Sequence, residues 1–304
     1  MTVLTVWDSS TGKESFRKLV KNHFDSTARK AVVQSPKLYN MRDSDLLFER
    51  DLRTASLPPG AAVPEGGRIP IYSPKFGGTK DYNQAEYGLG FRVSWMMKKT
   101  NQMGYVKKWT TSLSMRQKEL KDTELAKLWN SPTATYTGFD SQVLGYALHT
   151  CLDDSSTTFS NIGSAAISVA ALESAEYYFD IMKDDQGTSF MTPIKGGLLY
   201  FQPTLKYTVM EILRSTGKPH ELSNTYNYWE DRFEPYPYIR LTSTTAWGLC
   251  AIKSDLYDVN CYTLAEPDVE TFNPTDGTRD TVVNSHQAFS WGFGDARCVY
   301  IGNT

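Results

Sequence analysis

The side chains most able to do chemistry in this 304-residue chain are its four histidines and four cysteines. The histidines lie far apart and form neither an H-x-x-x-H nor an H-E-x-x-H pattern, so their spacing does not predict a zinc site. No two cysteines form a C-x-x-C pair, and four are too few for a disulfide framework in a chain of this length. We expect packed or surface histidines and reduced, mostly buried thiols. These residues are His23, His149, His220, His286, Cys151, Cys250, Cys261 and Cys298.

Acidic and glycine-rich segments offer no complete motif either. Asp180, Asp184 and Asp185 lack the alternating oxygen ligands of a calcium loop, so we interpret them as a solvated helix end. Gly217-Lys218 is followed by Pro219 and has no upstream glycine at Walker A spacing. Gly88-Leu89-Gly90 lacks the third glycine of a dinucleotide site. We therefore predict no catalytic, cofactor-binding or metal-binding residues, no cofactor and no enzyme activity.

Serine nucleophiles are equally unsupported. The chain contains no G-x-S-x-G elbow. Ser15 and Lys18 are spaced as S-x-x-K, but the other penicillin-binding motifs are absent from the sequence, so chance explains this match. A hydrolase with a non-standard site stays open as an alternative, and a pocket holding a histidine beside an acid and a nucleophile would support it.

Composition excludes several classes of protein. The chain is 40% hydrophobic and 22% charged, which is ordinary for a globular protein, and its formal net charge is −2. No basic stripe dominates the sequence, so tight sequence-independent wrapping of DNA is not expected. No secretory signal begins at Met1, and no apolar run reaches the ~18 residues of a membrane span. We expect a protein that folds in the cytosol and has no membrane partner.

The first half of the chain looks built for contacts rather than for a compact core. Residues 9–31 predict a short helix with Phe16, Val20 and Phe24 on one face, which is too narrow to form a core and needs another surface, such as a neighbouring subunit. Two strand-like runs follow, at 68–74 and 87–96. They predict a long hairpin with few large apolar residues near its tip, which must lie across a partner.

A long helix is the clearest element. Val106, Trp109, Leu113 and Leu120 recur at near-helical spacing, with charged residues between them, and the predicted helix covers residues 103–130. Aromatic and basic residues intermingle at 98–109. A stacking platform for single-stranded nucleic acid would look like this, but a solvated helix face explains the segment better.

The second half predicts a small α+β layer followed by strands. Helix, strand and helix are expected at 164–183, 197–202 and 205–215. Apolar runs at 238–241 and 246–252 predict further strands, and those at 269–273 and 282–285 predict a late hairpin.

These segments, in this order, resemble the major capsid proteins of tailed bacteriophages with the Hong Kong 97-like fold, particularly the Mu-like major head subunits. The resemblance covers roughly residues 40 to 302. It depends on the order and spacing of several stretches rather than on one motif. They are Pro64 to Gly67, Tyr87 to Ser94, the long helix after them, Leu148 to Asn161, Ser164 to Met182, Leu198 to Pro203, Ala246 to Leu249 and Trp291 to Arg297.

The resemblance implies an α+β fold with an N-terminal arm (1–48), an extended loop hairpin (49–100), a peripheral domain with a spine helix (101–160), an axial domain (161–265) and a return to the peripheral domain (266–304). It also implies a structural protein whose copies form hexamers and pentamers of an icosahedral head around double-stranded DNA, without sequence-specific binding. The expected location is the virion, with assembly in the host bacterial cytoplasm. A separate scaffolding protein, a portal and a decoration protein are the other implied partners.

Two processing steps of the family are not expected here. Only about 40 residues precede the resemblance, so we expect no large N-terminal cleavage, and no motif identifies a partner for a lysine crosslink. An encapsulin-type compartment shell and a monomeric binding module stay open as alternatives. For contacts between subunits we single out charged residues of the hairpin, namely Arg68, Lys75, Lys80, Glu86 and Arg92.

Overall fold

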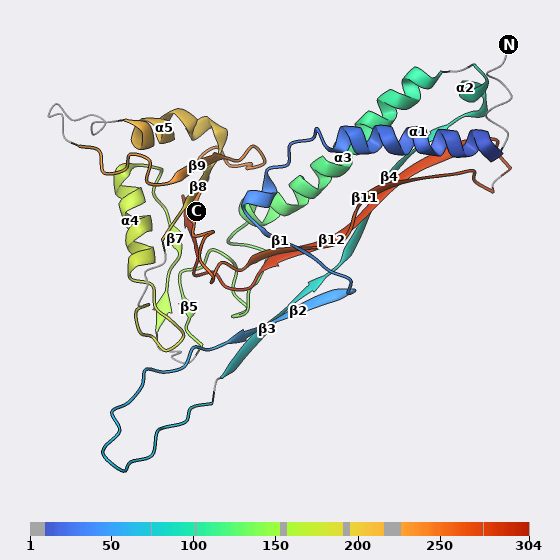
Figure 1. Ribbon diagram of the computed structural model, residues 1–304. Helices are drawn as coiled ribbons and strands as arrows, with labels where there is room; N and C mark the ends of the chain where they lie inside the picture. The colour runs from blue at the N-terminus through green and yellow to red at the C-terminus, as the bar shows by residue number, and fades with distance from the viewer. Residues whose placement is uncertain are drawn as a thin grey trace.

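The computed structural model of the chain describes residues 10–73, 75–100, 102–152, 157–190, 195–215, 226–275 and 277–303. His220 and the first nine residues of the predicted arm lie outside these ranges. The molecule has an elongated part built on a long sheet, a rounded part at one end of it, and a loop that projects away from both (Figure 1).

The elongated part is a four-stranded sheet in the order β1-β11-β12-β4. Its two long strands form an antiparallel hairpin, and β4 adds to β12 in antiparallel register, with Gly90 opposite Asn284. The short β1 adds to β11 in parallel, about 220 residues away in the sequence. The predicted late hairpin is thus confirmed and is longer than expected. The strands are β1 (Asn40–Asp43), β4 (Ala85–Val93), β11 (Val259–Phe272) and β12 (Thr281–Phe293).

One face of this sheet is covered by the predicted long helix, α3 (Met103–Asn130), which is 28 residues long. Pro132 follows it closely, as expected. The helix face toward the sheet carries unusually many buried polar side chains, among them Ser114, Gln117 and Lys121. Gln117 donates to the carbonyl of Ser285 at 2.8 Å, and Gln287 donates to Gln117 at 2.9 Å. Hydrogen bonds as well as apolar packing therefore join helix and sheet.

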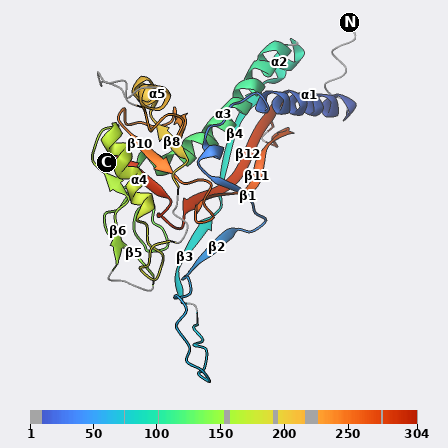
Figure 2. The same cartoon turned by 60° about the vertical axis from the view of Figure 1, so that its left-hand side comes forward.

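The N-terminal helix α1 (Ser10–Ala28) forms where the sequence predicts it, but not as a free arm. Phe16, Val20 and Phe24 are buried in a small core together with Val106 and Leu113 of α3. The surface that this narrow apolar face needs is therefore the chain's own α3 and β11, so the expectation of a neighbouring subunit there was wrong. Figure 2 shows α1 beside α3, with the two helices meeting at an angle.

The rounded part is a five-stranded sheet in the order β7-β13-β10-β8-β9, packed with two helices. It holds most of the main hydrophobic core, and all four residues of β8 and of β10 are buried. The helix–strand–helix prediction is confirmed, with a shorter first helix. The elements are β7 (Ile162–Gly163), α4 (Val169–Asp180), β8 (Leu198–Phe201), α5 (Lys206–Arg214), β9 (Glu234–Pro237), β10 (Trp247–Cys250) and β13 (Val299–Gly302).

The predicted strand at 238–241 was wrong. The strand there is β9, which ends at Pro237 and pairs in parallel with β8. Tyr238 instead turns the chain inward: its backbone N–H donates to Phe201, and its hydroxyl lies 3.0 Å from that of Ser35. The apolar residues at 238–241 indicate that the segment is buried, but they do not determine whether its backbone forms a strand.

The predicted hairpin between 68–74 and 87–96 was also wrong in its pairing. Strand β3 (Phe76–Asn83) pairs with β2 (Phe48–Thr54), while β4 pairs with β12 of the long sheet. Residues 68–73 contain no regular structure. The chain from 76 to 93 therefore changes its strand partner at Gln84. Before Gln84 it pairs with β2, and after Gln84 it pairs with β12. The remaining short elements are η1 (Ser35–Lys37), α2 (Trp95–Lys99), β5 (His149–Thr150), β6 (Thr158–Phe159) and η2 (Pro203–Leu205).

Candidate subunit interface

The β2–β3 ribbon is a stalk that carries the projecting loop, which we define as residues 57–73. Arg50 and Asp81 face each other across the ribbon, with two N–O distances of 2.6 and 2.7 Å. At the far end the backbone N–H of Ala55 donates to the carbonyl of Lys75 at 2.9 Å. The loop therefore leaves and re-enters the ribbon at a closed base.

Beyond this base the loop does not pack against its own subunit. Figures 1 and 2 show it standing away from both parts of the molecule. Ile71 is 95% exposed, and Leu57, Ile69 and Tyr72 are also exposed. A turn at Pro64, closed by a 2.8 Å bond from the N–H of Gly67, shapes the tip. Apolar side chains held in water in this way are typical of a surface that a partner covers.

The base of the loop is fixed by a buried ion cluster, which we call the loop-base clamp. Arg53 of β2 pairs with Asp185 at 2.5 Å, and Arg297 lies 3.5 Å from the same carboxylate. Arg297 also pairs with Asp295. Burial alone raises the pKa of Asp295, but the neighbouring Arg297 guanidinium outweighs it and brings this pKa to about 2. The clamp thus ties the stalk to the rounded part through buried ion pairs.

The five charged residues singled out from the sequence are not brought together. Arg68 and Lys75 are exposed on or beside the projecting loop. Lys80 is half-buried, donates to the carbonyl of Thr137 at 2.7 Å, and has a pKa lowered by burial. Glu86 and Arg92 lie in β4, where Arg92 approaches Asp280 at 3.9 Å. Within one subunit, Lys80 and Arg92 therefore already have partners.

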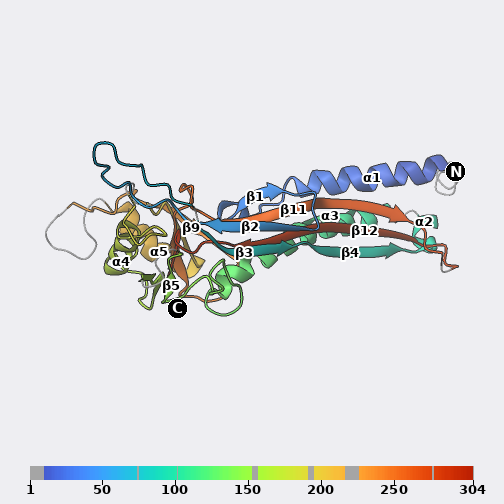
Figure 3. The same ribbon diagram turned by 90° about the horizontal axis from the view of Figure 1, so that it is seen from below.

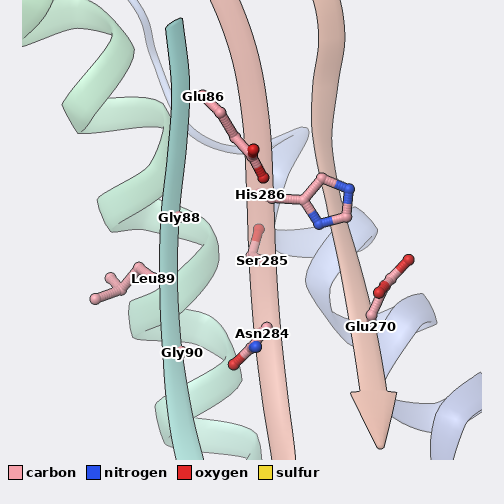
Figure 4. A pocket seen from close by; sticks show the side chains of 8 residues that line it. All are labelled: Glu86, Gly88, Leu89, Gly90, Glu270, Asn284, Ser285 and His286. Atoms are coloured by element: carbon pink, nitrogen blue, oxygen red, sulfur yellow. The ribbon is translucent and has the colours of Figure 1, made fainter.

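Glu86 contributes to a shallow groove of about 600 Å³ across the long sheet. It lies on the face opposite α3, because its Asn284 and His286 alternate along β12 with residues buried against that helix. Figure 4 shows Glu86, Glu270 and His286 around this groove, with Gly88 and Gly90 leaving its floor bare. Its lining is acidic and polar, and it is open to solvent.

Sequence reasoning missed the apolar residues of the interface. Leu46, Leu47 and Phe48, at the start of the stalk, are exposed, as are Ile69 and Ile71 in the loop. The signal was present, because Pro70 lies between Ile69 and Ile71 and has no backbone N–H, so this strand-like run is poorly suited to pairing within a sheet. Such residues cannot be buried by their own segment and must be covered from outside.

Ionisable groups elsewhere are arranged for structure. His149 is buried, stacks on Phe159 and lies 2.6 Å from Asp140, whose pKa is lowered by this hydrogen bond against the effect of burial. Burial raises the pKa of Cys261 to about 11 and that of Cys298 to about 12, so these thiols stay protonated. Among the described residues, no group of histidine, cysteine and acidic side chains could hold a metal ion. No helix in the same part of the chain is long and apolar enough to cross a bilayer.

Comparison with known proteins agrees with this architecture. The model of a family described as "Phage capsid protein" matches residues 77–302. No curated protein sequence matches the chain. Many solved structures do match, at low sequence identity.

Three of these structures illustrate the fold. The capsid of the cyanophage P-SCSP1u is 12% identical, with a TM-score of 0.54 over 90% of this chain and 88% of that one. The procapsid of bacteriophage JBD30 is 10% identical, with a TM-score of 0.55 over 96% and 75%. A virus-like particle from Pyrococcus furiosus is 9% identical, with a TM-score of 0.51 over 94% and 98%. The expected Hong Kong 97-like α+β fold is therefore confirmed.

Proposed function

The chain belongs to the phage capsid protein family, and from this membership we propose that its copies form hexamers and pentamers of an icosahedral head around double-stranded DNA. It is a structural protein of a capsid shell. The two ring sizes, the enclosed DNA and the absence of catalysis are parts of this proposal. An encapsulin-type compartment shell is not favoured, because the matching family is one of phage capsid proteins.

The observation that carries the proposal is the projecting loop. It exposes several large apolar side chains on a stalk whose base is clamped to the body of the subunit. A loop held out in this way cannot lower its free energy by folding back, so contact with another copy covers its apolar surface. Contacts that repeat from one copy to the next close into rings, and many weak contacts together stabilise a shell.

We further propose that the loop of one copy lies over the sheet groove of the next. The loop contains one cation, Arg68, and one acid, Glu65, whereas the groove is lined by two acids, Glu86 and Glu270. Attraction between Arg68 and these acids favours this pairing. Of the five residues predicted for subunit contacts, Arg68 and Glu86 gain most support, and Lys75, Lys80 and Arg92 stay as predictions.

We also propose the division of the chain with the boundaries given above. Its parts are an arm, an extended loop hairpin, a peripheral domain with a spine helix, an axial domain and a return segment. Also proposed are a separate scaffolding protein, a portal and a decoration protein as partners, the absence of lysine crosslinks, and assembly in the host cytoplasm. The virion is where a shell protein of this family resides.

The test replaces residues 57–73 by a short Gly-Ser linker. We expect a folded subunit, with unchanged circular dichroism, that fails to form capsomers or particles in sedimentation velocity and electron micrographs as concentration rises. The control is Val32→Ser, because Val32 is 90% exposed but lies outside the loop, and it should assemble like the wild type. Particles formed without the loop, or a wild-type chain that stays a lone subunit at every concentration, would contradict the proposal.

A further inference from the structure

The chain is nearly neutral overall, but its basic and acidic residues are concentrated in different segments. Residues 10–30 and 95–130, which hold the helices α1, α2 and α3, contain 14 Lys and Arg but only 5 Asp and Glu. The rest of the chain contains 18 Lys and Arg against 29 Asp and Glu. The helical segments are therefore strongly basic, and the remainder is strongly acidic.

The fold gathers these helices on one side of the long sheet. α1 and α3 share a small core and both lie above the sheet in Figure 1, while Figure 3 shows the strands in front of α3. The groove with Glu86 and Glu270 lies on the other side. The helical side is therefore basic and the groove on the other side is lined by acids, of which Glu270, at the edge of the sheet, also lines the groove between α1 and β11. We call the α1–α3 side the helical face.

Much of the positive charge on the helical face is not neutralised. Lys21 pairs with Asp268, and Lys118 with Glu266, so these cations are satisfied by the sheet. Five others are exposed, and no described carboxylate forms an ion pair with them. They are Lys18, Arg29, Lys30, Lys107 and Lys108.

The acidic residues of the same face do not cancel this charge. Glu119 and Glu124 pair with Arg116 and Lys127 of the same helix, and Asp122 is buried beneath the surface. The two carboxylates of α1, Glu14 and Asp25, are fewer than the five unpaired cations.

A groove of about 460 Å³ between α1 and β11 adds to the basic character. Arg17, Lys18 and Lys21 form its helical wall, and Glu270 is the acid among its lining residues. Its opposite wall is the edge of β11 near Val269 and Phe272.

We propose that the helical face binds the phosphate backbone of double-stranded DNA. The unpaired cations lie on both helical segments, with Lys107 and Lys108 near the start of α3 and Lys18, Arg29 and Lys30 in or just after α1, so more than one of them can contact the regularly spaced phosphates of one duplex. The proposal rests on the proposed shell function, since it also places this face toward the enclosed DNA.

The binding is weak for each subunit. Each phosphate contact contributes about 0.9 to the slope of log K against log salt, so five contacts give a slope of about −4 to −5. A single subunit then binds measurably only at low salt, whereas a shell of many copies holds DNA through many contacts and still releases it. Lysines that contact only phosphates carry no sequence preference.

The test measures binding of a fluorescein-labelled 24-base-pair duplex of random sequence by anisotropy, between about 25 and 200 mM salt. The variant Lys18→Glu/Lys107→Glu/Lys108→Glu reverses three unpaired cations of the helical face. The control Lys195→Glu/Lys206→Glu/Lys253→Glu makes the same change in net charge on exposed lysines of the rounded part. Circular dichroism checks that both variants fold.

We expect the helical-face variant to lose at least tenfold in affinity at 50 mM salt and its salt slope to fall by about 2 to 3. The control should stay within about threefold of the wild type. Equal losses in both variants, or no binding by the wild type, would overturn the proposal. Equally tight binding of polyglutamate would overturn it too, because it would identify an acidic protein as the partner. Particles seen in electron micrographs of all three chains would show that the shell function survives such a failure.

Discussion

The carboxylate of Asp122 accepts a 2.8 Å hydrogen bond from the backbone N–H of Ser35, a residue 87 positions earlier in the chain. Asp122 lies in the middle of α3, and its other oxygen is 3.4 Å from the guanidinium of Arg240. One buried side chain therefore joins the segment after α1, the long helix and the segment after β9. These three parts of the molecule have no strand pairing in common.

Replacing this acid should loosen all three segments. Asp122→Ala leaves the N–H of Ser35 without its acceptor and Arg240 without one of its two carboxylates, so we expect a loss of about 2–4 kcal/mol in the free energy of unfolding. Urea denaturation at a concentration below assembly measures it. Asp45→Ala, on an exposed residue, is the control, and an equal effect of both changes would refute the structural role of Asp122.

Breaking the loop-base clamp should free the projecting loop. In Arg53→Met, Asp185 keeps Arg297 as a partner but loses its closer one, so we expect a loss of about 2–4 kcal/mol. Hydrogen exchange at the amide of Ala55, which bonds to Lys75, should become faster. Arg50→Met removes an exposed pair of the same strand and should change neither quantity noticeably, because exposed pairs contribute little. Unchanged exchange in Arg53→Met would mean that the clamp does not hold the loop.

Two glycines of β4 should respond differently to the same substitution. A Cβ on Gly90 would lie 2.9 Å from the carbonyl oxygen of Val283 and closer still to Asn284, whereas a Cβ on Gly88 would meet nothing nearer than 3.7 Å. We expect Gly90→Ala to cost about 1–3 kcal/mol and Gly88→Ala to be neutral or slightly stabilising. The urea midpoints of the two variants, compared at constant m value, measure this difference in stability. Equal midpoints would show that β4 can move away from β12.

Asp258 should make stability depend on pH between about 4 and 6. Burial raises its pKa to about 6, although Asn260 donates to it at 2.6 Å, and Asp51 and Asp295 add to the rise. Because the folded chain holds the proton more tightly than the unfolded chain, this contribution to stability is complete below about pH 4. It is lost as the pH rises through 6, and amounts to about 2–3 kcal/mol.

The check compares the free energy of unfolding at pH 4.5 and 7 in the wild type and in Asp258→Asn. The asparagine cannot titrate, so stability should fall less between these pH values in the variant than in the wild type. Arg42, which partly opposes the shift, is present in both proteins. An identical pH dependence would mean that Asp258 titrates normally in the folded chain.

Local sequence predicted what depends on local sequence. The recurrence of apolar residues such as Val106 and Leu113 predicted the long helix, although polar side chains, among them Ser114 and Gln117, share its buried face. The β8 strand and the α5 helix also appeared where expected. Strand pairing was harder, because residues 76–93 change partners at Gln84 and nothing in the composition of the run marks that change. The segment that begins at Tyr238 shows the same limit, because a short apolar run is expected both for a buried strand and for a buried segment that is not a strand.

The candidate interface stays a prediction, but the structure changes which residues support it. Reasoning from charge pointed to Lys80 and Arg92, which the fold turns toward Thr137 and Asp280 of the same subunit. The exposed side chains of Ile69 and Ile71 carry more of the proposed contact. Their environment depends on how the stalk is clamped, and that involves Asp185 and Arg297, more than 100 residues away in the sequence.

The pairing of the long sheet has a consequence for synthesis. β1 and β4 have their strand partners in β11 and β12, about two hundred residues later, so neither can pair while the ribosome is still making the middle of the chain. Contacts this distant in sequence form slowly. The stalk and its apolar loop can close early, since β2 and β3 are neighbours, whereas the body that carries the groove exists only when translation is nearly finished. Newly made chains therefore pass through a stage in which the apolar loop is exposed but the groove has not yet formed. At this stage chaperones protect aggregation-prone intermediates.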